Sequence, residues 1–221
     1  MTKTTALIAG ATGLVGGHLL EYLLASPRHS RVVAVTRQPL ELTHDKLNNL
    51  VVDFDDLEDG IRATGIKTDE AYCALGTTIK KAGSQAAFRK VDFDYETAFA
   101  RASLEAGAKR FALVSAVGAS ASSSIFYSRV KGETEEAIRA MGFPALHIFQ
   151  PGVLLGQRGE ARPAEQLAIA VTPILNLGLQ GPLRKYRGIA AADVAKAMLA
   201  ALETEGAEAT HRYADMKEAA R

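Results

Sequence analysis

The sequence predicts a doubly wound α/β fold, in which helices cover both faces of a parallel sheet. Apolar strand-like runs alternate with segments whose apolar residues recur every three or four positions. A glycine-rich turn, Gly10 to Gly16, joins the first apolar run to the first helical segment. Gly107 and Gly142 each follow a helical segment directly before the next strand, as glycines that end helices do.

The elements can be assigned in order along the chain. The expected strands are residues 4–9, 31–36, 50–52, 70–75, 110–115 and 145–149. The expected helices are residues 14–25, 86–106, 126–141 and 192–202. About 70 residues follow Gly152, and their prolines and glycines predict irregular connections around a short helix at residues 164–171. We expect one domain, residues 1–221, in which residues 152–221 form a small C-terminal cap on the substrate side.

Composition narrows the class of protein. The chain has 221 residues, 48% of them hydrophobic, and a formal net charge of +1. This balance gives no electrostatic reason to expect nucleic acid or a membrane surface as a partner. No segment has the layout of a signal peptide or the length of a membrane span, so we expect a cytoplasmic protein. Cys73 lies in an apolar run and is expected to be a core thiol, and the scattered histidines predict no metal site.

The glycine turn has the properties of a phosphate site. Gly10 permits a tight turn, Gly13 lets a pyrophosphate approach the backbone, and Gly16 lets helix and strand pack closely. The helix N-terminus adds unpaired N–H groups and a positive dipole. The predicted phosphate site consists of Gly10, Thr12, Gly13, Leu14, Val15 and Gly16. Two residues, rather than one, separate the first two glycines, and a turn that only connects strand and helix is the alternative.

The end of the second strand indicates which dinucleotide would bind. An NAD site usually carries an acidic residue about 20 residues past the glycines, where it bonds the ribose hydroxyls. This strand ends in Thr36 and Arg37, and a guanidinium fork suits a ribose 2′-phosphate. We therefore expect NADP rather than NAD. Asp53 and Phe54 follow the third strand and are expected near the adenine, although Asp53 suits a helix cap equally well.

A serine, a tyrosine and a lysine in the second half suggest catalysis. Tyr127 and Lys131 lie four residues apart on one helix face. A nearby ammonium would lower the pKa of the phenol toward neutrality, so Tyr127 is expected to act as the acid/base. Lys131 can also bind the nicotinamide ribose. Ser115, at the carboxyl end of its strand, can polarise a substrate carbonyl.

Together these residues resemble the short-chain dehydrogenase/reductase superfamily, whose members have an NAD(P)-binding Rossmann fold. Three further blocks, residues 73–78, 91–95 and 149–155, are similar to the atypical branch that includes the Tat-interacting protein oxidoreductases. The resemblance implies that a loop after the fourth strand lies along the cofactor, and that a turn after the sixth strand lies near the nicotinamide. The residues concerned are Leu75, Gly76, Thr77 and Thr78 in the loop, and Pro151, Gly152 and Val153 in the turn.

The chain departs from extended relatives at one catalytic position. Such relatives usually place the catalytic serine two residues beyond Ser115, where this chain has Val117. Ser115, Ser120 or one of Ser122–Ser124 must then polarise the carbonyl, unless no residue does. The short C-terminal region implies a small substrate, and Arg158 and Arg162 are the candidates for recognising it.

Three functions remain open from the sequence, and the last of them, an epimerase or dehydratase with a retained cofactor, would need a larger substrate pocket than the remaining residues suggest. The first is an NADP-dependent oxidoreductase acting on a small carbonyl or alcohol. The second is a non-catalytic NADPH sensor that acts through a protein partner, because the branch includes proteins discussed as regulators. The expected partners are a small-molecule substrate and, as alternatives, a protein partner or a second subunit, with neither nucleic acid nor a membrane.

Overall fold

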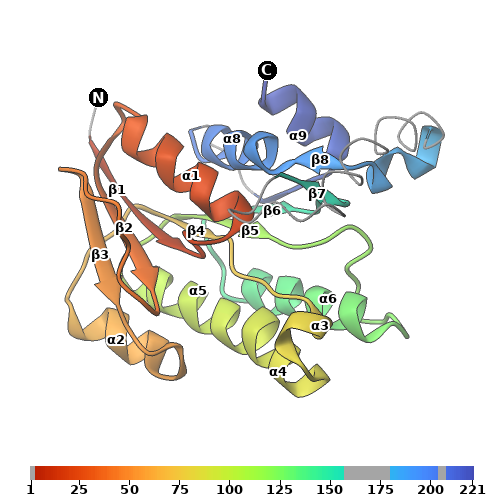
Figure 1. Ribbon diagram of the computed structural model, residues 1–221, viewed down its shortest axis with the longest axis horizontal. Helices are drawn as coiled ribbons and strands as arrows, with labels where there is room; N and C mark the ends of the chain where they lie inside the picture. The colour runs from red at the N-terminus through yellow and green to blue at the C-terminus, as the bar shows by residue number, and fades with distance from the viewer. Residues whose placement is uncertain (1–2, 157–179, 204–207) are drawn as a thin grey trace.

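The computed structural model describes residues 3–156, 180–203 and 208–221 (Figure 1). Its main sheet has seven strands in the order β3-β2-β1-β4-β5-β6-β9, and each neighbouring pair is parallel. The strands are β1 (Thr4–Ala9), β2 (His29–Thr36), β3 (Leu47–Val51), β4 (Glu70–Cys73), β5 (Arg110–Val114), β6 (Ala145–Phe149) and β9 (Glu208–His211). The first six follow the Rossmann order, which confirms the predicted fold class.

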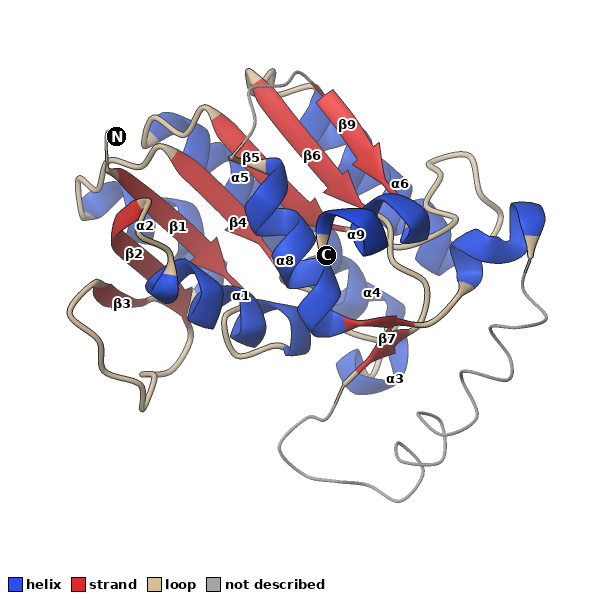
Figure 2. Cartoon of the chain, turned by 90° about the horizontal axis from the view of Figure 1, so that it is seen from above, coloured by secondary structure: helices blue, strands red, loops and turns tan. Residues whose placement is uncertain are grey.

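Helices cover both faces of this sheet (Figures 1 and 2). One face is covered by α1 (Leu14–Ala25), α8 (Ala191–Ala201) and α9 (Tyr213–Ala219). The other is covered by α2 (Leu57–Ala63), α5 (Glu96–Glu105) and α6 (Phe126–Arg139). Alternate residues of each strand enter the two cores: in β1, Ala6 and Ile8 belong to the first core, whereas Leu7 and Ala9 belong to the second.

The expected helix at residues 86–106 is divided in the structure. A short helix α3 (Ile79–Ala82) precedes α4 (Gln85–Arg89), which continues through a π-helical turn, η2 (Lys90–Tyr95), into α5. Such turns insert a residue into the helical repeat and are common at functional sites. Apolar periodicity does not distinguish this turn from regular helix, so the sequence predicted one continuous segment. A 3-10 turn, η1 (Phe54–Asp56), leads into α2.

The C-terminal region differs most from the expectation. Rather than forming only a cap, its described part completes the fold, because β9 pairs with β6 and α8 shares a core with α1. A separate two-stranded sheet joins β7 (Leu154–Leu155) to β8 (Ile189–Ala190), and a 3-10 helix, η3 (Gly181–Tyr186), precedes β8. The helix expected at residues 164–171 lies outside the described residues. Among the helices that the structure describes, none is long and apolar enough to cross a membrane.

A buried ionic cluster lies at the amino ends of the central strands. Glu70, the first residue of β4, is fully buried. Its carboxylate accepts two hydrogen bonds of 2.9 Å from Arg28 and contacts the His29 ring. Tyr72 donates to the same carboxylate, and Arg110 approaches it from β5. Burial alone would raise the pKa of Glu70, but His29 and Arg28 bring it below its ordinary value.

We expect Glu70→Gln to lower the free energy of unfolding by about 3 kcal/mol, because it removes the anion from a buried ion pair. The control is Glu203→Gln, which changes the exposed carboxylate 3.8 Å from Arg28 and should cost less than about 1 kcal/mol. Urea denaturation at pH 7 measures both.

The same cluster gives a pH dependence. Because the folded pKa of Glu70 is depressed, its contribution is complete above the unfolded value of about 4.5 and is lost as the pH falls through the folded value. The difference between wild type and Glu70→Gln should therefore shrink in acid. Equal losses for the two variants at pH 7 would contradict the assigned role.

Candidate functional site

Two glycines in the turn between β1 and α1 lie too close to other backbone atoms to carry a side chain. Gly10 has φ of +89°, and a Cβ there would lie 2.3 Å from the carbonyl oxygen of Ala74. A Cβ on Gly16 would lie 2.0 Å from the carbonyl oxygen of Gly10, so this glycine serves packing, as predicted. Gly13 precedes α1, and neither a side-chain cap nor an acidic residue occupies the first turn. The N–H groups at this end of α1 therefore remain available for an anion.

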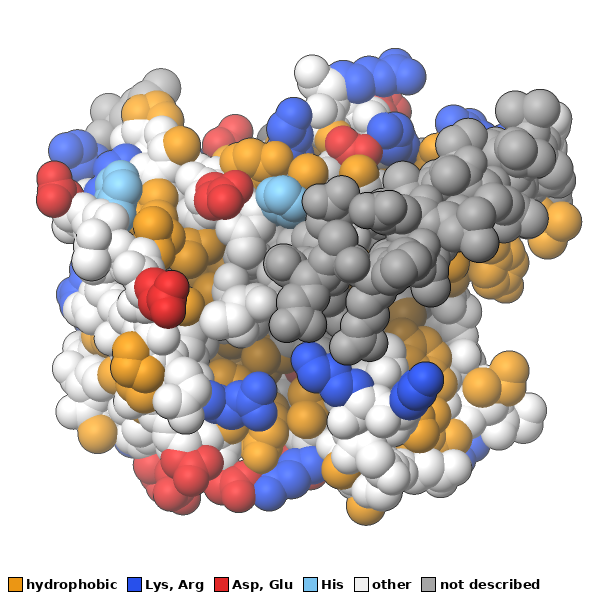
Figure 3. Space-filling model, viewed as in Figure 1, with side chains coloured by type: hydrophobic (Ala, Val, Ile, Leu, Met, Phe, Trp, Pro, Cys, Tyr) orange, Lys and Arg blue, Asp and Glu red, His pale blue; other side chains and the backbone are white. Residues whose placement is uncertain are grey.

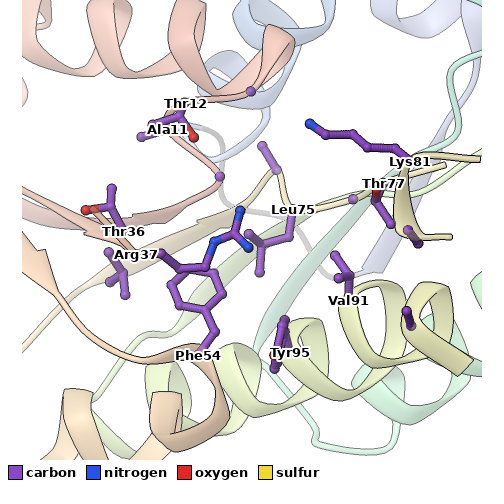
Figure 4. Close-up of a pocket in the computed structure, with 17 residues that line it drawn as sticks. Ala11, Thr12, Thr36, Arg37, Phe54, Leu75, Thr77, Lys81, Val91 and Tyr95 are labelled. Carbon is purple, nitrogen blue, oxygen red and sulfur yellow. The ribbon is translucent and has the colours of Figure 1, made fainter. Parts of the chain in front are cut away.

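A first cavity of about 320 Å³ opens in front of this turn (Figure 4). Arg37, just past β2, extends into it, and its guanidinium carbon lies 5.7 Å from the centre of the Phe54 ring. Lys81 of α3 reaches across from the opposite side toward the turn that carries Ala11 and Thr12 (Figure 4). Within the described residues, no carboxylate pairs with Lys81. Figure 3 shows basic side chains gathered where the surface is hollowed below the α1 layer.

A second cavity of about 270 Å³ adjoins the first. The two share part of their lining: Thr12, Gly13, Ala74, Leu75, Gly76, Thr77 and Lys81. The second cavity is also lined by Leu14 and Val15 of α1, by Thr78, and by the three predicted catalytic residues Ser115, Tyr127 and Lys131. The fold therefore gathers most of the predicted site residues along the carboxyl edge of the sheet.

Lys131 is held between two carboxyl groups. Its Nζ lies 2.8 Å from Asp92 Oδ1 and 2.8 Å from Glu96 Oε1. The other oxygen of Asp92 accepts a 2.9 Å hydrogen bond from the backbone N–H of Thr77, which links Lys131 to the loop after β4. Burial alone would lower the pKa of Lys131, but Glu96 and Asp92 raise it well above its ordinary value. Lys131 is therefore a permanent cation.

Glu96 is fully buried, and no described group hydrogen-bonds its Oε2 atom. Asp92 Oδ1 also has no hydrogen-bond partner in the described structure, although it lies 2.8 Å from Lys131 Nζ. Burial raises the pKa of Glu96 to about 8, and Asp92 adds to the effect, although Lys131 opposes it. At neutral pH Glu96 is therefore mostly protonated, and the charges of Lys131 and Asp92 balance.

The structure corrects the expected titration of Tyr127. Its ring packs against buried Phe88, with the ring centres 5.4 Å apart. Burial raises the pKa of the phenol; Lys131 lowers it, but Asp92 and Glu96 act in the opposite direction. The prediction of a pKa near neutrality is therefore wrong, because it counted the ammonium and left out first the burial of the phenol and then the nearby carboxyl groups. Tyr127 is a neutral phenol, which can donate a proton.

Ser115 lines the second cavity, but its hydroxyl has a partner. It donates to Glu135, a buried carboxylate on α6 that also accepts from Gln150. A serine has a single proton to donate. Polarisation of a substrate carbonyl by Ser115 stays a prediction, and it requires this hydrogen bond to break.

The geometry agrees with the comparison to known families. Residues 10–205 match the profile described as NAD(P)H-binding. The chain belongs to this family. Among curated relatives, the HTATIP2 protein of Rattus norvegicus is 39% identical over 76% of this chain and 70% of its own length. The fmp52 protein of Emericella nidulans is 36% identical over 73% of this chain and 71% of its own length.

Solved structures share the fold of this chain. The WbmH enzyme of Bordetella bronchiseptica, solved with NAD⁺, matches 96% of this chain and 76% of its own, with a TM-score of 0.70 and 15% identity. A UDP-glucose 4-epimerase of Thermotoga maritima matches 94% and 76%, with a TM-score of 0.69 and 16% identity. The profile match and the HTATIP2 relative confirm the predicted family, and the likeness to these enzymes concerns the fold alone.

The expected cytoplasmic location is corrected by the same comparison. Several fungal members of the family, 36–38% identical to this chain, are named as mitochondrial proteins. The cytoplasmic prediction is therefore wrong. It rested on secretory and membrane-spanning signals, and neither one tests for a mitochondrial location.

Asp53 does not line either cavity. Its side chain accepts a 3.0 Å hydrogen bond from the N–H of Asp55 and so caps the 3-10 turn η1. The structure therefore supports the alternative that the sequence left open for this residue. Phe54, by contrast, does line the first cavity.

The turn after β6 also lies outside the two cavity linings. The carbonyl of Pro151 accepts a hydrogen bond from Val117, and a Cβ on Gly152 would lie 2.6 Å from the carbonyl oxygen of Arg187, so both residues serve backbone packing. Val153 is 63% exposed. Leu154, the next residue, lines the second cavity instead. Arg158 and Arg162 lie outside the described residues.

Sequence reasoning missed Asp92 and Glu96 as members of the site. A signal was present, because two acidic residues four apart lie within a segment predicted to be helical and largely apolar. Lys81 is a further cavity residue that the sequence did not predict, and its position at the junction of the two cavities depends on the short helix α3, which was not predicted either.

The glycine turn offers a matched pair of substitutions. Gly16→Ala should destabilise the protein by about 1–3 kcal/mol, because its Cβ would overlap backbone that cannot move aside. Gly17→Ala should be neutral or stabilise by up to about 1 kcal/mol, because the nearest atom to its Cβ is 3.7 Å away and alanine favours helix. Urea denaturation measures both. A tolerated Gly16→Ala would contradict the close packing of this turn.

Proposed function

We propose that this protein binds NADP(H) and reduces a small carbonyl compound or oxidises the corresponding alcohol. The observation that supports it is the continuity of the two cavities. One cavity contains an arginine that suits a 2′-phosphate, and the other contains a tyrosine and a lysine that suit proton transfer. Between them lies a helix N-terminus that suits phosphates. The family supplies NAD(P) binding, and the choice of NADP and the reaction are our proposal.

The residues present fit the cofactor. Gly10 and Gly16 let the turn pack against backbone where a Cβ would overlap, and the first turn of α1 has no competing cap. Lys81 adds a positive charge across from this N-terminus, as a pyrophosphate requires. These groups would hold the two phosphates.

The first cavity would hold the adenosine half. No carboxylate of the described chain lines it, and Asp53, the nearest candidate by sequence, caps η1. Arg37 lies against the Phe54 ring, which fixes the plane of its guanidinium. A guanidinium fork binds a phosphate in two places, so this wall favours a ribose that carries a 2′-phosphate.

The second cavity would hold the nicotinamide half, and the bound cofactor would supply a hydride. Tyr127, protonated at neutral pH, would donate its proton to the substrate oxygen. Lys131, fixed by two carboxyl groups, would position the ribose from its place in the cavity wall.

The alternative is a non-catalytic NADPH sensor. One observation favours it: the hydroxyl of Ser115 is bound by Glu135, and Val117 stands where extended relatives usually have a serine. Under this alternative the cofactor sites keep the same residues, but Tyr127 is dispensable.

Arg37→Gln tests the cofactor preference. We expect wild type to bind NADPH more tightly than NADH, and Arg37→Gln to lower the affinity for NADPH about 10- to 100-fold with little change for NADH, because charge-assisted hydrogen bonds are lost. Isothermal titration calorimetry measures all four affinities. The control is Arg31→Gln, an exposed arginine on the same strand. Tighter binding of NADH by wild type would overturn the assignment.

Tyr127→Phe tests catalysis. With a panel of small aldehydes and ketones, we expect NADPH consumption by wild type and a fall in kcat of about 100-fold or more in the variant, because the proton donor is removed. Tyr22→Phe on α1 is the control. Equal turnover by Tyr127→Phe would contradict the assigned acid. NADPH binding without turnover of any compound would favour the sensor.

A further inference from the structure

The charge of the second cavity wall depends on one buried group. Asp92 Oδ2 accepts a hydrogen bond from the Thr77 N–H, and Asp92 Oδ1 lies 2.8 Å from Lys131 Nζ as an ion pair without a hydrogen bond. Glu96 uses only Oε1, and its Oε2 atom is buried without a described partner. When both carboxyl groups are ionised, the three side chains carry one net negative charge, and when Glu96 is protonated they carry none.

Very little separates this cluster from the cavity. Asp92 and Lys131 themselves line it, and Glu96 lies directly behind Lys131. The loop in front is Gly76, where a Cβ would lie 3.4 Å from Asp92 Oδ1 and 3.8 Å from Lys131 Nζ. The electrostatic interaction between Glu96 and a ligand in this cavity therefore acts through protein, where the effective dielectric constant is lower than in water.

We propose that Glu96 determines which oxidation state of the nicotinamide is bound more tightly. This inference rests on the proposed function, which places the nicotinamide half in the second cavity. An oxidised nicotinamide ring carries a positive charge and a reduced ring carries none. An ionised Glu96 therefore favours NADP⁺ over NADPH, and a protonated Glu96 removes that preference.

The ionisation of Glu96 falls within an accessible pH range, since its pKa is raised to about 8. Other groups face it from each neighbouring element. They are Asp92 on η2, Lys131, Glu135 and Tyr127 on α6, and Cys73 on β4. Burial raises the pKa of Cys73 and of Tyr127, and Glu96 and Asp92 raise that of Lys131. All three therefore stay protonated as the pH rises to 9.

The test compares the dissociation constants of NADP⁺ and NADPH by calorimetry between pH 6.5 and 9. Taking the ratio of the two constants cancels the titration of the 2′-phosphate, which both forms carry. In wild type the ratio should shift about 15- to 30-fold toward NADP⁺ as the pH rises, as one charge about 8–10 Å away would produce at an effective dielectric constant of about 20. In Glu96→Gln the ratio should stay flat, and Glu105→Gln, on the same helix, should behave as wild type.

The possible outcomes separate the two proposals. Glutamine has the shape of a protonated glutamate, so Glu96→Gln represents the uncharged state of the group. If this variant folds poorly, the pH profile of the wild-type ratio tests the inference alone. A flat ratio in wild type, or an equal shift in Glu96→Gln, overturns the role of Glu96 and leaves NADP binding intact. Failure of wild type to bind either form overturns the proposed function, and the inference with it.

Discussion

The close approach of backbone to backbone at the β1–α1 turn is the constraint on which the rest of the site depends. Side chains at Gly10 and Gly16 would occupy the positions of the Ala74 and Gly10 carbonyl groups. Their absence lets α1 begin directly at the edge of the sheet, with its N-terminus facing the loop after β4. From there α1 packs along the sheet beside α8, so the same contact fixes one core layer and opens the cleft. The phosphate end of the site is thus a consequence of how the first βα unit packs.

The buried charged groups at the two ends of the strands differ in how completely their charges are compensated. At the amino ends, Glu70 has an excess of cationic and hydrogen-bonding partners, which keep it ionised and stabilise the fold. At the carboxyl ends, Lys131 has an excess of carboxyl groups, and one of them, Glu96, is left partly unsatisfied. A group whose charge can change near neutral pH is of little use for stability. It lies instead beside the cavity that contains Tyr127, where a change of charge acts on a ligand.

Local signals in the sequence were enough to predict the fold and the outline of the site. Gly10, Gly16, Arg37, Tyr127 and Lys131 were found from spacing and from the ends of elements, because a parallel sheet brings the carboxyl ends of its strands together. The features that were missed depend on long-range contacts. The π-helical turn has the same apolar pattern as a regular helix, and β9 is too short to be recognised without its partner β6. The pKa of Tyr127 was predicted in the wrong direction because the phenol is buried, and because Asp92 and Glu96 reach Lys131 from other elements.

These carboxyl groups also affect how the proposed reaction would proceed. In the simplest tyrosine–lysine pair, the ammonium acts on the phenol alone and favours its ionised form. In this chain burial raises the pKa of Tyr127 and Asp92 opposes the effect of Lys131, so Tyr127 keeps its proton at neutral pH. The hydroxyl of Ser115 is meanwhile held by Glu135. Polarising a substrate carbonyl and protonating its oxygen would then both fall to Tyr127. Such an arrangement suits reduction better than oxidation, because oxidation requires a group that is ready to accept a proton.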